Sequence, residues 1–220
     1  MDADDIAVND RLEKQFNYME QNPECDICGT NIDYINLSGD YVKNNSDIPV
    51  ESAVINECLK YKNCMSHPTY FAKTSIMKNV QYRENLRYAQ DYDFICRCAE
   101  QGLIIHNIND VLLHYRIGNV SPNKLMRQSM TAYFVKMHYK QGTLCAKADI
   151  SLEIQDEINK YGEEELTASA SYKNLIKEIL VSVIHCKLRR TIKLIRLLIL
   201  PHPYRIDVKQ SEKEYRKLLN

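Results

Sequence analysis

The 220-residue sequence lacks three features that would assign it quickly to a class. It has no net charge, because 29 Lys and Arg residues balance 29 Asp and Glu residues, so its charge does not favour nucleic acid as a partner. It does not open with a basic and apolar leader, so no secretory signal peptide is expected. It also has no internal repeat and no low-complexity tract. A chain of this length can bury a core, and we expect one globular domain with an appendage.

The cysteines do not have the density or setting of a small secreted disulfide scaffold. Most of the eight lie in apolar segments, where a free thiol behaves as a small hydrophobic group, so a reducing cytoplasm is expected. Cys25 and Cys28, with Cys58 and Cys64, offer zinc as an alternative. The two pairs differ in spacing, which makes this alternative the weaker one, and stoichiometric zinc in a metal analysis would support it.

Three carboxylates stand close together at the start of the chain, at Asp2, Asp4 and Asp5. Like charges repel, so a folded chain keeps such a group ionised where a cation or donor groups neutralise it. Mg²⁺ is often held by one or two carboxylates and substrate phosphates, and D-x-D-D is therefore a candidate metal-diphosphate clamp. An EF-hand is excluded, because the required glycine and glutamate do not follow. The alternative is a frayed acidic terminus that favours the positive end of the next helix.

Helices and strands alternate up to about Ser121, and helices follow it. We predict a helix with Leu12, Phe16 and Met19 at helical spacing, and place a boundary at Ser121, giving domains 1–121 and 122–220. Breaks in the later helical pattern fall around Gly142 and Gly162. The first domain is predicted to contain helices over 9–22, 50–60 and 91–99 and extended segments over 25–32, 34–37, 67–72, 103–108 and 111–117.

Several motifs resemble those in the middle of family 2 glycosyltransferases, and they follow one another in the same order. The resemblance covers roughly residues 1–125. It is carried by Met1-Asp2-Ala3-Asp4-Asp5, Arg11-Leu12-Glu13-Lys14-Gln15, Asn22-Pro23, Gly29, His67-Pro68-Thr69, Tyr82-Arg83, Gln90-Asp91-Tyr92-Asp93 and Leu112-Leu113-His114-Tyr115-Arg116 followed by Ser121.

The resemblance implies a partial GT-A (Rossmann-like) mixed α/β sheet with helices, followed by an all-helical C-terminal region. It implies an inverting transfer from a nucleotide-sugar, such as a UDP-sugar, to a saccharide or lipid-linked acceptor in glycan or surface polysaccharide synthesis. Asp2 and Asp4 would bind a divalent metal, Mg²⁺ or Mn²⁺, with Asp4 the more direct ligand and Asp5 behind it or at the helix start. Asp91 matches the catalytic base, and Asp2, His67 and Arg116 fall at donor-binding positions.

Each of these residues also has a structural interpretation. Asp91 is suited to accepting a proton and to staying ionised at a helix start. Its structural interpretation is an N-cap that contributes about 1 kcal/mol, and the two roles can coexist. His67 could be a satisfied histidine before a strand, and Arg116 could pair with a surface carboxylate. Asp93 is predicted to be solvated or to cap the helix.

The sequence departs from the family in three places. Gly118 stands where many members have a histidine, and Ile95 stands where tryptophan is common. The D-x-D motif begins at residue 2, although in the family several nucleotide-binding strands and helices precede it. We therefore expect a C-terminal portion of the enzyme, with an exposed sheet edge and weak or no donor binding by itself. Micromolar binding of a UDP-sugar would contradict this expectation.

A second class of function comes from residues 179–206, which contain no acidic residue. Basic and apolar residues interleave there in the manner of an amphipathic helix on an anionic bilayer, too short and too charged to cross it. The chain could therefore be a non-catalytic remnant that acts as a binding or membrane-associated module, or a protein at the inner face of the membrane. The alternative is a helix that packs its apolar stripe on the catalytic domain.

Overall fold

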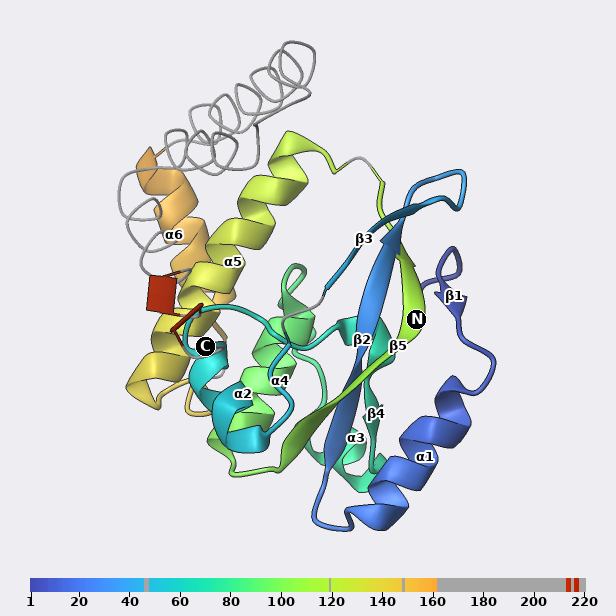
Figure 1. Ribbon diagram of the computed structural model, residues 1–220. Coiled ribbons are helices and arrows are strands. Elements are labelled where there is room, and N and C mark those ends of the chain that lie inside the picture. The colour runs from blue at the N-terminus through green and yellow to red at the C-terminus, as the bar shows by residue number, and fades with distance from the viewer. Residues whose placement is uncertain (46–47, 119, 148, 162–212, 215, 218–220) are drawn as a thin grey trace.

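The computed structural model describes residues 1–45, 48–118, 120–147, 149–161, 213–214 and 216–217. These residues form a mixed α/β fold around one five-stranded sheet, as predicted (Figure 1). The strands are β1 (Ile6–Ala7), β2 (Ile27–Ile35), β3 (Tyr41–Asn44), β4 (Phe71–Ala72) and β5 (Ile105–Arg116). The helices are α1 (Arg11–Gln21), α2 (Ser52–Leu59), the 3-10 turn η1 (His67–Thr69), α3 (Thr74–Val80), α4 (Gln90–Glu100), α5 (Pro122–Gln141) and α6 (Ser151–Tyr161).

The sheet is built on two long strands, β2 and β5, which pair in parallel. The strand order is β1-β5-β2-β3, and β4 also pairs with β2; the pairings other than β2 with β5 are antiparallel. The separate strands predicted over 25–32 and 34–37 are wrong, because β2 continues through both. The predicted pair of strands over 103–108 and 111–117 is likewise wrong, because both belong to one strand, β5. The register of its pairing with β2 shifts at Asn31, but the strand continues.

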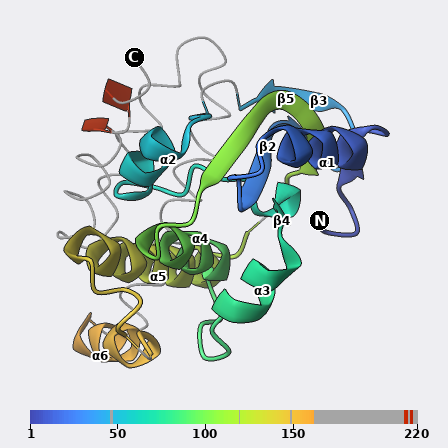
Figure 2. The same cartoon turned by 90° about the horizontal axis from the view of Figure 1, so that it is seen from below.

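The helices divide between two sides of the strands. In both Figures 1 and 2, β2 and β4 lie between α1 and α4, and α5 and α6 follow on the α4 side. The helix predicted over 91–99 corresponds to α4, which ends before Gly102. Gly102 has a φ of +78°, the left-handed conformation that glycine adopts at helix ends. Helix α3 was not predicted, because its seven residues are too few to show a helical period, although Ile76, Met77 and Val80 pack half-buried against the core.

One hydrophobic cluster runs through the sheet and the α4 side. It joins Ile27 and Ile105 of the parallel strands to Phe94 of α4, Met130 of α5 and Leu144 after α5. Residues on both sides of Ser121 therefore share a core. Within the described residues after 121, the regular structure is helical, as predicted.

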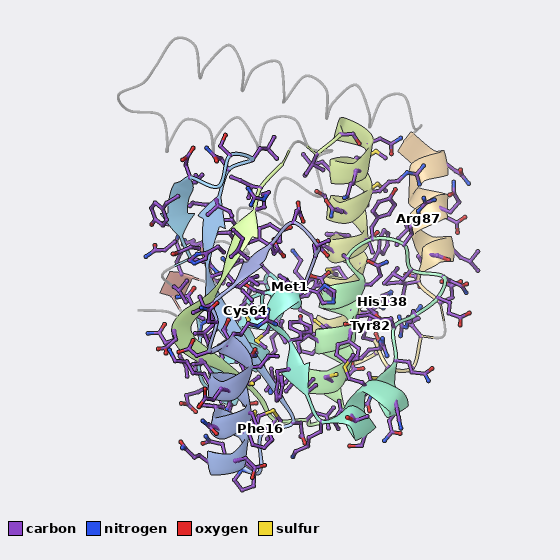
Figure 3. All side chains as sticks on the ribbon, turned by 90° about the vertical axis from the view of Figure 1, so that its right-hand side faces the viewer. Met1, Phe16, Cys64, Tyr82, Arg87 and His138 are labelled. Carbon is purple, nitrogen blue, oxygen red and sulfur yellow. The ribbon has the colours of Figure 1, made fainter. Side chains whose placement is uncertain are left out.

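Helix α1 turns inward a polar face that adjoins the face that its apolar pattern predicts. Leu12 and Phe16 are 65% and 55% exposed, whereas Arg11 and Gln15 are buried against the sheet. Figure 3 shows Phe16 on α1 at the periphery of the molecule. The predicted inward stripe is wrong for Leu12 and Phe16, whereas Met19 is half-buried. Hydrogen bonds from the polar face hold this helix, as described below.

The segment 179–206, for which an amphipathic helix is predicted, lies outside the described residues, as does Gly162. Among the helices that the structure describes, none combines the length and apolar character needed to cross a bilayer.

Candidate functional site

The acidic start of the chain folds into a turn that Arg116 holds in place. The buried Asp5 carboxylate accepts hydrogen bonds from the backbone N–H groups of Arg116 (3.0 Å) and Asp2 (3.3 Å). The Arg116 side chain donates from Nε to the Asp4 carbonyl (2.8 Å) and from Nη1 to the carbonyls at 36–37 (2.7 and 3.0 Å). The Asp5 carboxylate is therefore occupied by hydrogen bonds within the protein, whereas Asp2 and Asp4 are exposed.

The polar face of α1 fixes this turn against η1. Arg11 donates from Nη2 to the Pro68 carbonyl (2.7 Å), and Gln15 donates from Nε2 to the Thr69 carbonyl (2.7 Å). Arg11 Nε also donates to Gln15 Oε1 (3.0 Å). Burial lowers the pKa of the Arg11 guanidinium, and the nearby Asp5 carboxylate partly offsets that effect. The turn at the start of the chain and the turn that carries His67 are thus joined through one helix.

The 3-10 turn is also locked to the sheet. Thr69, fully buried, accepts from the Thr30 N–H at Oγ1 (3.0 Å) and donates to the Ser66 carbonyl (2.7 Å). The approach is close because β2 has Gly29 here: a Cβ at Gly29 would lie 2.9 Å from Met65 Cε and 3.4 Å from Thr69 Oγ1. The predicted extended segment over 67–72 is therefore half right, with a turn preceding β4.

His67 lies on an aromatic cluster. Its Nε2 is 3.0 Å from the Tyr82 hydroxyl, and its ring meets the Tyr70 ring edge-on at 5.2 Å. Tyr82 in turn stacks on Phe94 at 4.8 Å. Burial raises the pKa of the Tyr82 hydroxyl, and the charge of Asp91 raises it further. The hydroxyl therefore stays protonated at neutral pH and is able to donate to His67.

Asp91 lies in the first turn of α4, one residue beyond the start of the helix. The N-cap is Ala89, in the left-handed conformation (φ 50°, ψ 32°), and not Asp91. The Asp91 carboxylate instead accepts from Asn63 Nδ2 (2.9 Å), and Asn63 Oδ1 accepts from the Met65 N–H (3.0 Å). This bridge orients one carboxylate oxygen. The interpretation of Asp91 as an N-cap is wrong.

Asp93 is neither solvated nor capping, which corrects the prediction for this residue. It is fully buried and forms ion pairs with Arg97 (2.8 Å) and Arg83 (3.1 Å). Arg97 also donates to the backbone carbonyls at 80–81, both at 2.7 Å. The Asp93 cluster (Asp93, Arg83 and Arg97) thereby ties the loop before α4 to the helix.

These segments surround a cavity of about 830 Å³. Its lining includes a strand side, with Tyr34 and Tyr115, and a helical side, with Lys124 and Gln128 on α5. The remaining lining residues are Asp2, Ile32, Asn45, Ile48, the run 62–68 and the run 87–91.

Three of the predicted site residues meet in this cavity: Asp2, His67 and Asp91. Asp4 and Arg116 do not line it; Arg116 is engaged with the acidic turn that contains Asp4. Sequence reasoning missed Asn63, because an asparagine in a polar connection carries no pattern of its own. It also missed Arg87 and Lys124, which are ordinary surface cations until the fold brings them to one cavity.

The acidic turn fits a divalent cation in one limited way. Within the described residues, no cluster of three or more His, Cys, Asp or Glu side chains is arranged to hold a metal. Mg²⁺ in phosphate sites often takes one or two carboxylates and completes its shell with substrate oxygens and water. Asp2 and Asp4 could supply the carboxylates. The zinc alternative is also unsupported within the described residues, where Cys25, Cys28, Cys58 and Cys64 are buried free thiols.

Comparison with known proteins gives consistent relatives. No protein-family model matches the chain. An uncharacterized glycosyltransferase of Methanocaldococcus jannaschii is 35% identical over 146 residues, covering 64% of this chain and 49% of the relative. The O-antigen biosynthesis glycosyltransferase WbnJ of Escherichia coli is 36% identical over 66% of this chain and 57% of its own length. The amylovoran biosynthesis glycosyltransferase AmsE of Erwinia amylovora is 29% identical, over 64% of this chain and 54% of its own.

Among solved structures, TarS 1–349 of S. aureus in complex with UDP matches 99% of this chain and 65% of that chain, at 14% identity and a TM-score of 0.46. The chain spans about half the length of the curated relatives it matches. Over about two thirds of its own length, it is similar to proteins that are named as glycosyltransferases.

Proposed function

We propose that the protein takes part in the transfer of a sugar from a nucleotide-sugar donor to a saccharide acceptor, during assembly of a surface polysaccharide or another glycan. The observation that carries the proposal is the single cavity lined by Asp2, His67 and Asp91, residues that lie far apart in the sequence. The relatives' names, which refer to O-antigen and amylovoran biosynthesis, support the same class of reaction. Family 2 membership and a GT-A architecture are part of this proposal.

Asp91 is the proposed base. An acceptor hydroxyl transfers its proton to the carboxylate as its oxygen bonds to the anomeric carbon of the donor sugar. The bond from that carbon to the diphosphate breaks, and the nucleoside diphosphate leaves from the opposite face, which inverts the configuration. A carboxylate suffices as the base where proton transfer is late, and the hydrogen bond from Asn63 keeps one oxygen oriented.

Asp2 and Asp4 are the proposed ligands of a divalent cation, which would neutralise the charge that develops on the leaving diphosphate. His67, exposed at the cavity and backed by Tyr82, is proposed to bind the donor beside Asp2. Arg116 is proposed to act on the donor through the acidic turn, since its side chain donates to the turn's backbone.

The test is the variant Asp91→Asn, compared with the wild-type chain and with Asp110→Asn as the control. Asp110 is exposed on β5 and does not line the cavity. Release of nucleoside diphosphate from labelled UDP-, GDP- and dTDP-sugars with an oligosaccharide acceptor is the measurement. Removal of a general base should lower turnover by about 10²- to 10⁴-fold. Because weak donor binding is expected of this chain by itself, the donors are supplied at millimolar concentration. Wild-type turnover in Asp91→Asn, or no release by the wild-type chain under these conditions, would contradict the proposal.

A further inference from the structure

Three lysine and arginine side chains line the cavity: Lys62, which has an interaction of its own, and Arg87 and Lys124 on the helical side. Arg87 lies on the loop before α4, and Lys124 lies in the first turn of α5; both side chains are exposed. In the part of the chain that the structure describes, neither the Arg87 guanidinium nor the Lys124 ammonium forms a hydrogen bond or an ion pair. Gln128, four residues after Lys124 and therefore on the same face of α5, also lines the cavity. This side offers hydrogen-bond donors that the described protein does not use.

Among the described residues, neither acidic residue that lines the cavity, Asp2 or Asp91, forms an ion pair with the two cations of the helical side. Asp91 is hydrogen-bonded to Asn63, and Asp2 belongs to the turn that Arg116 holds on the strand side. In Figure 3, Met1 lies toward the strands and Arg87 lies farther toward α5 and α6. A donor diphosphate held at Asp2 would therefore leave Arg87 and Lys124 facing the other reactant.

We infer that Arg87 and Lys124 bind an anionic substituent of the acceptor, either the carboxylate of an acidic sugar or a phosphate group. The inference rests on the proposed function and adds the chemical class of the acceptor. A guanidinium presents paired N–H groups that match both carboxylate and phosphate oxygens, and an ammonium adds a point charge. Because both side chains are exposed, salt screens the attraction, and binding weakens as ionic strength rises.

Binding of two matched pairs of oligosaccharides to the full chain tests the inference. One pair is a glucuronate-containing tetrasaccharide and its carboxyl-reduced form; the other is a phosphorylated tetrasaccharide and its dephosphorylated form. We expect one acidic member to bind at least about ten-fold more tightly than its neutral partner in low salt, and that member identifies the anion. The double variant Arg87→Gln/Lys124→Gln should remove the preference, whereas Lys78→Gln should retain it. Lys78 is an exposed cation on α3 that does not line the cavity.

Equal binding of acidic and neutral members would overturn the inference, as would a preference that survives in the double variant. If the double variant weakened binding of UDP and left the acidic preference intact, the two cations would belong to the donor and the inference would be wrong. The variant Asp91→Asn separates this inference from the proposed function. Loss of sugar transfer with an unchanged acidic preference supports the anion site, and a wild-type chain that prefers the acidic oligosaccharide but releases no nucleoside diphosphate refutes only the proposed reaction.

Discussion

Asp91 and Asp93 lie two residues apart on α4 and have opposite environments. Asp91 is partly exposed at the cavity and takes one hydrogen bond from a neutral amide. Asp93 is withdrawn from water and balanced by two guanidinium groups. A side chain that reacts with a substrate needs access, and a side chain that fixes the loop beside it needs permanent partners. At the scale of single residues, one turn of helix thus supports both the proposed chemistry and the frame that surrounds it.

The variant Asp93→Asn should lower the free energy of unfolding by about 3–5 kcal/mol, because it leaves two arginines without a buried counter-charge. The control is Asp156→Asn, an exposed position on α6, which should change stability by less than about 0.5 kcal/mol. Urea denaturation followed by circular dichroism measures both. A loss no larger for Asp93→Asn than for the control would mean that the Asp93 cluster does not stabilise the fold.

The same contrast applies to α1 at the scale of secondary-structure elements. Its buried side chains are polar, and hydrogen bonds to the η1 backbone satisfy them. Its apolar side chains Leu12 and Phe16 face outward. Loss of the hydrogen-bond partner of a buried polar group lowers the free energy of unfolding more than removal of an exposed aromatic ring does. The attachment of α1 should therefore depend on Gln15 and not on Phe16.

The variant Gln15→Leu should lower the free energy of unfolding by about 1–3 kcal/mol, because the buried Thr69 carbonyl and Arg11 Nε each lose a partner. On the same helix, Phe16→Gln should change it by less than about 0.5 kcal/mol. Thermal and urea unfolding of the two variants measure the difference. The opposite order of effects would restore the apolar stripe as the packing face.

These elements also indicate which parts of the fold and site could be predicted. The helix at Gln90–Glu100 and the helical start at Pro122 have local signals, an apolar period and a terminal glycine or proline. The inward face of α1 has no such signal, since it depends on carbonyl groups more than fifty residues away along the chain. Motifs in the sequence predict Asp2, His67 and Asp91 as site residues. Asn63 belongs to no motif, and its role follows only from the hydrogen bond that the fold lets it donate to Asp91.

At the scale of the whole molecule, one hydrophobic core includes residues on both sides of the boundary predicted at Ser121. Met130 of α5 and Leu144 after α5 belong to the same cluster as Phe94 and Ile27. The Glu100 carboxylate at the end of α4 accepts from the Leu144 N–H (3.0 Å), and Arg83 donates to the Leu144 carbonyl (2.6 Å). Packing of this kind favours one cooperative unit over residues 1–161.

The variant Leu144→Ala tests this expectation against separate domains. Leu144 is fully buried, so the substitution should lower the free energy of unfolding by about 2–5 kcal/mol. The matched control Leu152→Ala, at a position that is 69% exposed, should have little effect. Tyrosine fluorescence and far-ultraviolet circular dichroism should report one coincident transition, which shifts as a whole in Leu144→Ala. Two transitions, of which only one shifts, would show that the helices after Ser121 unfold independently and that the predicted boundary separates two domains.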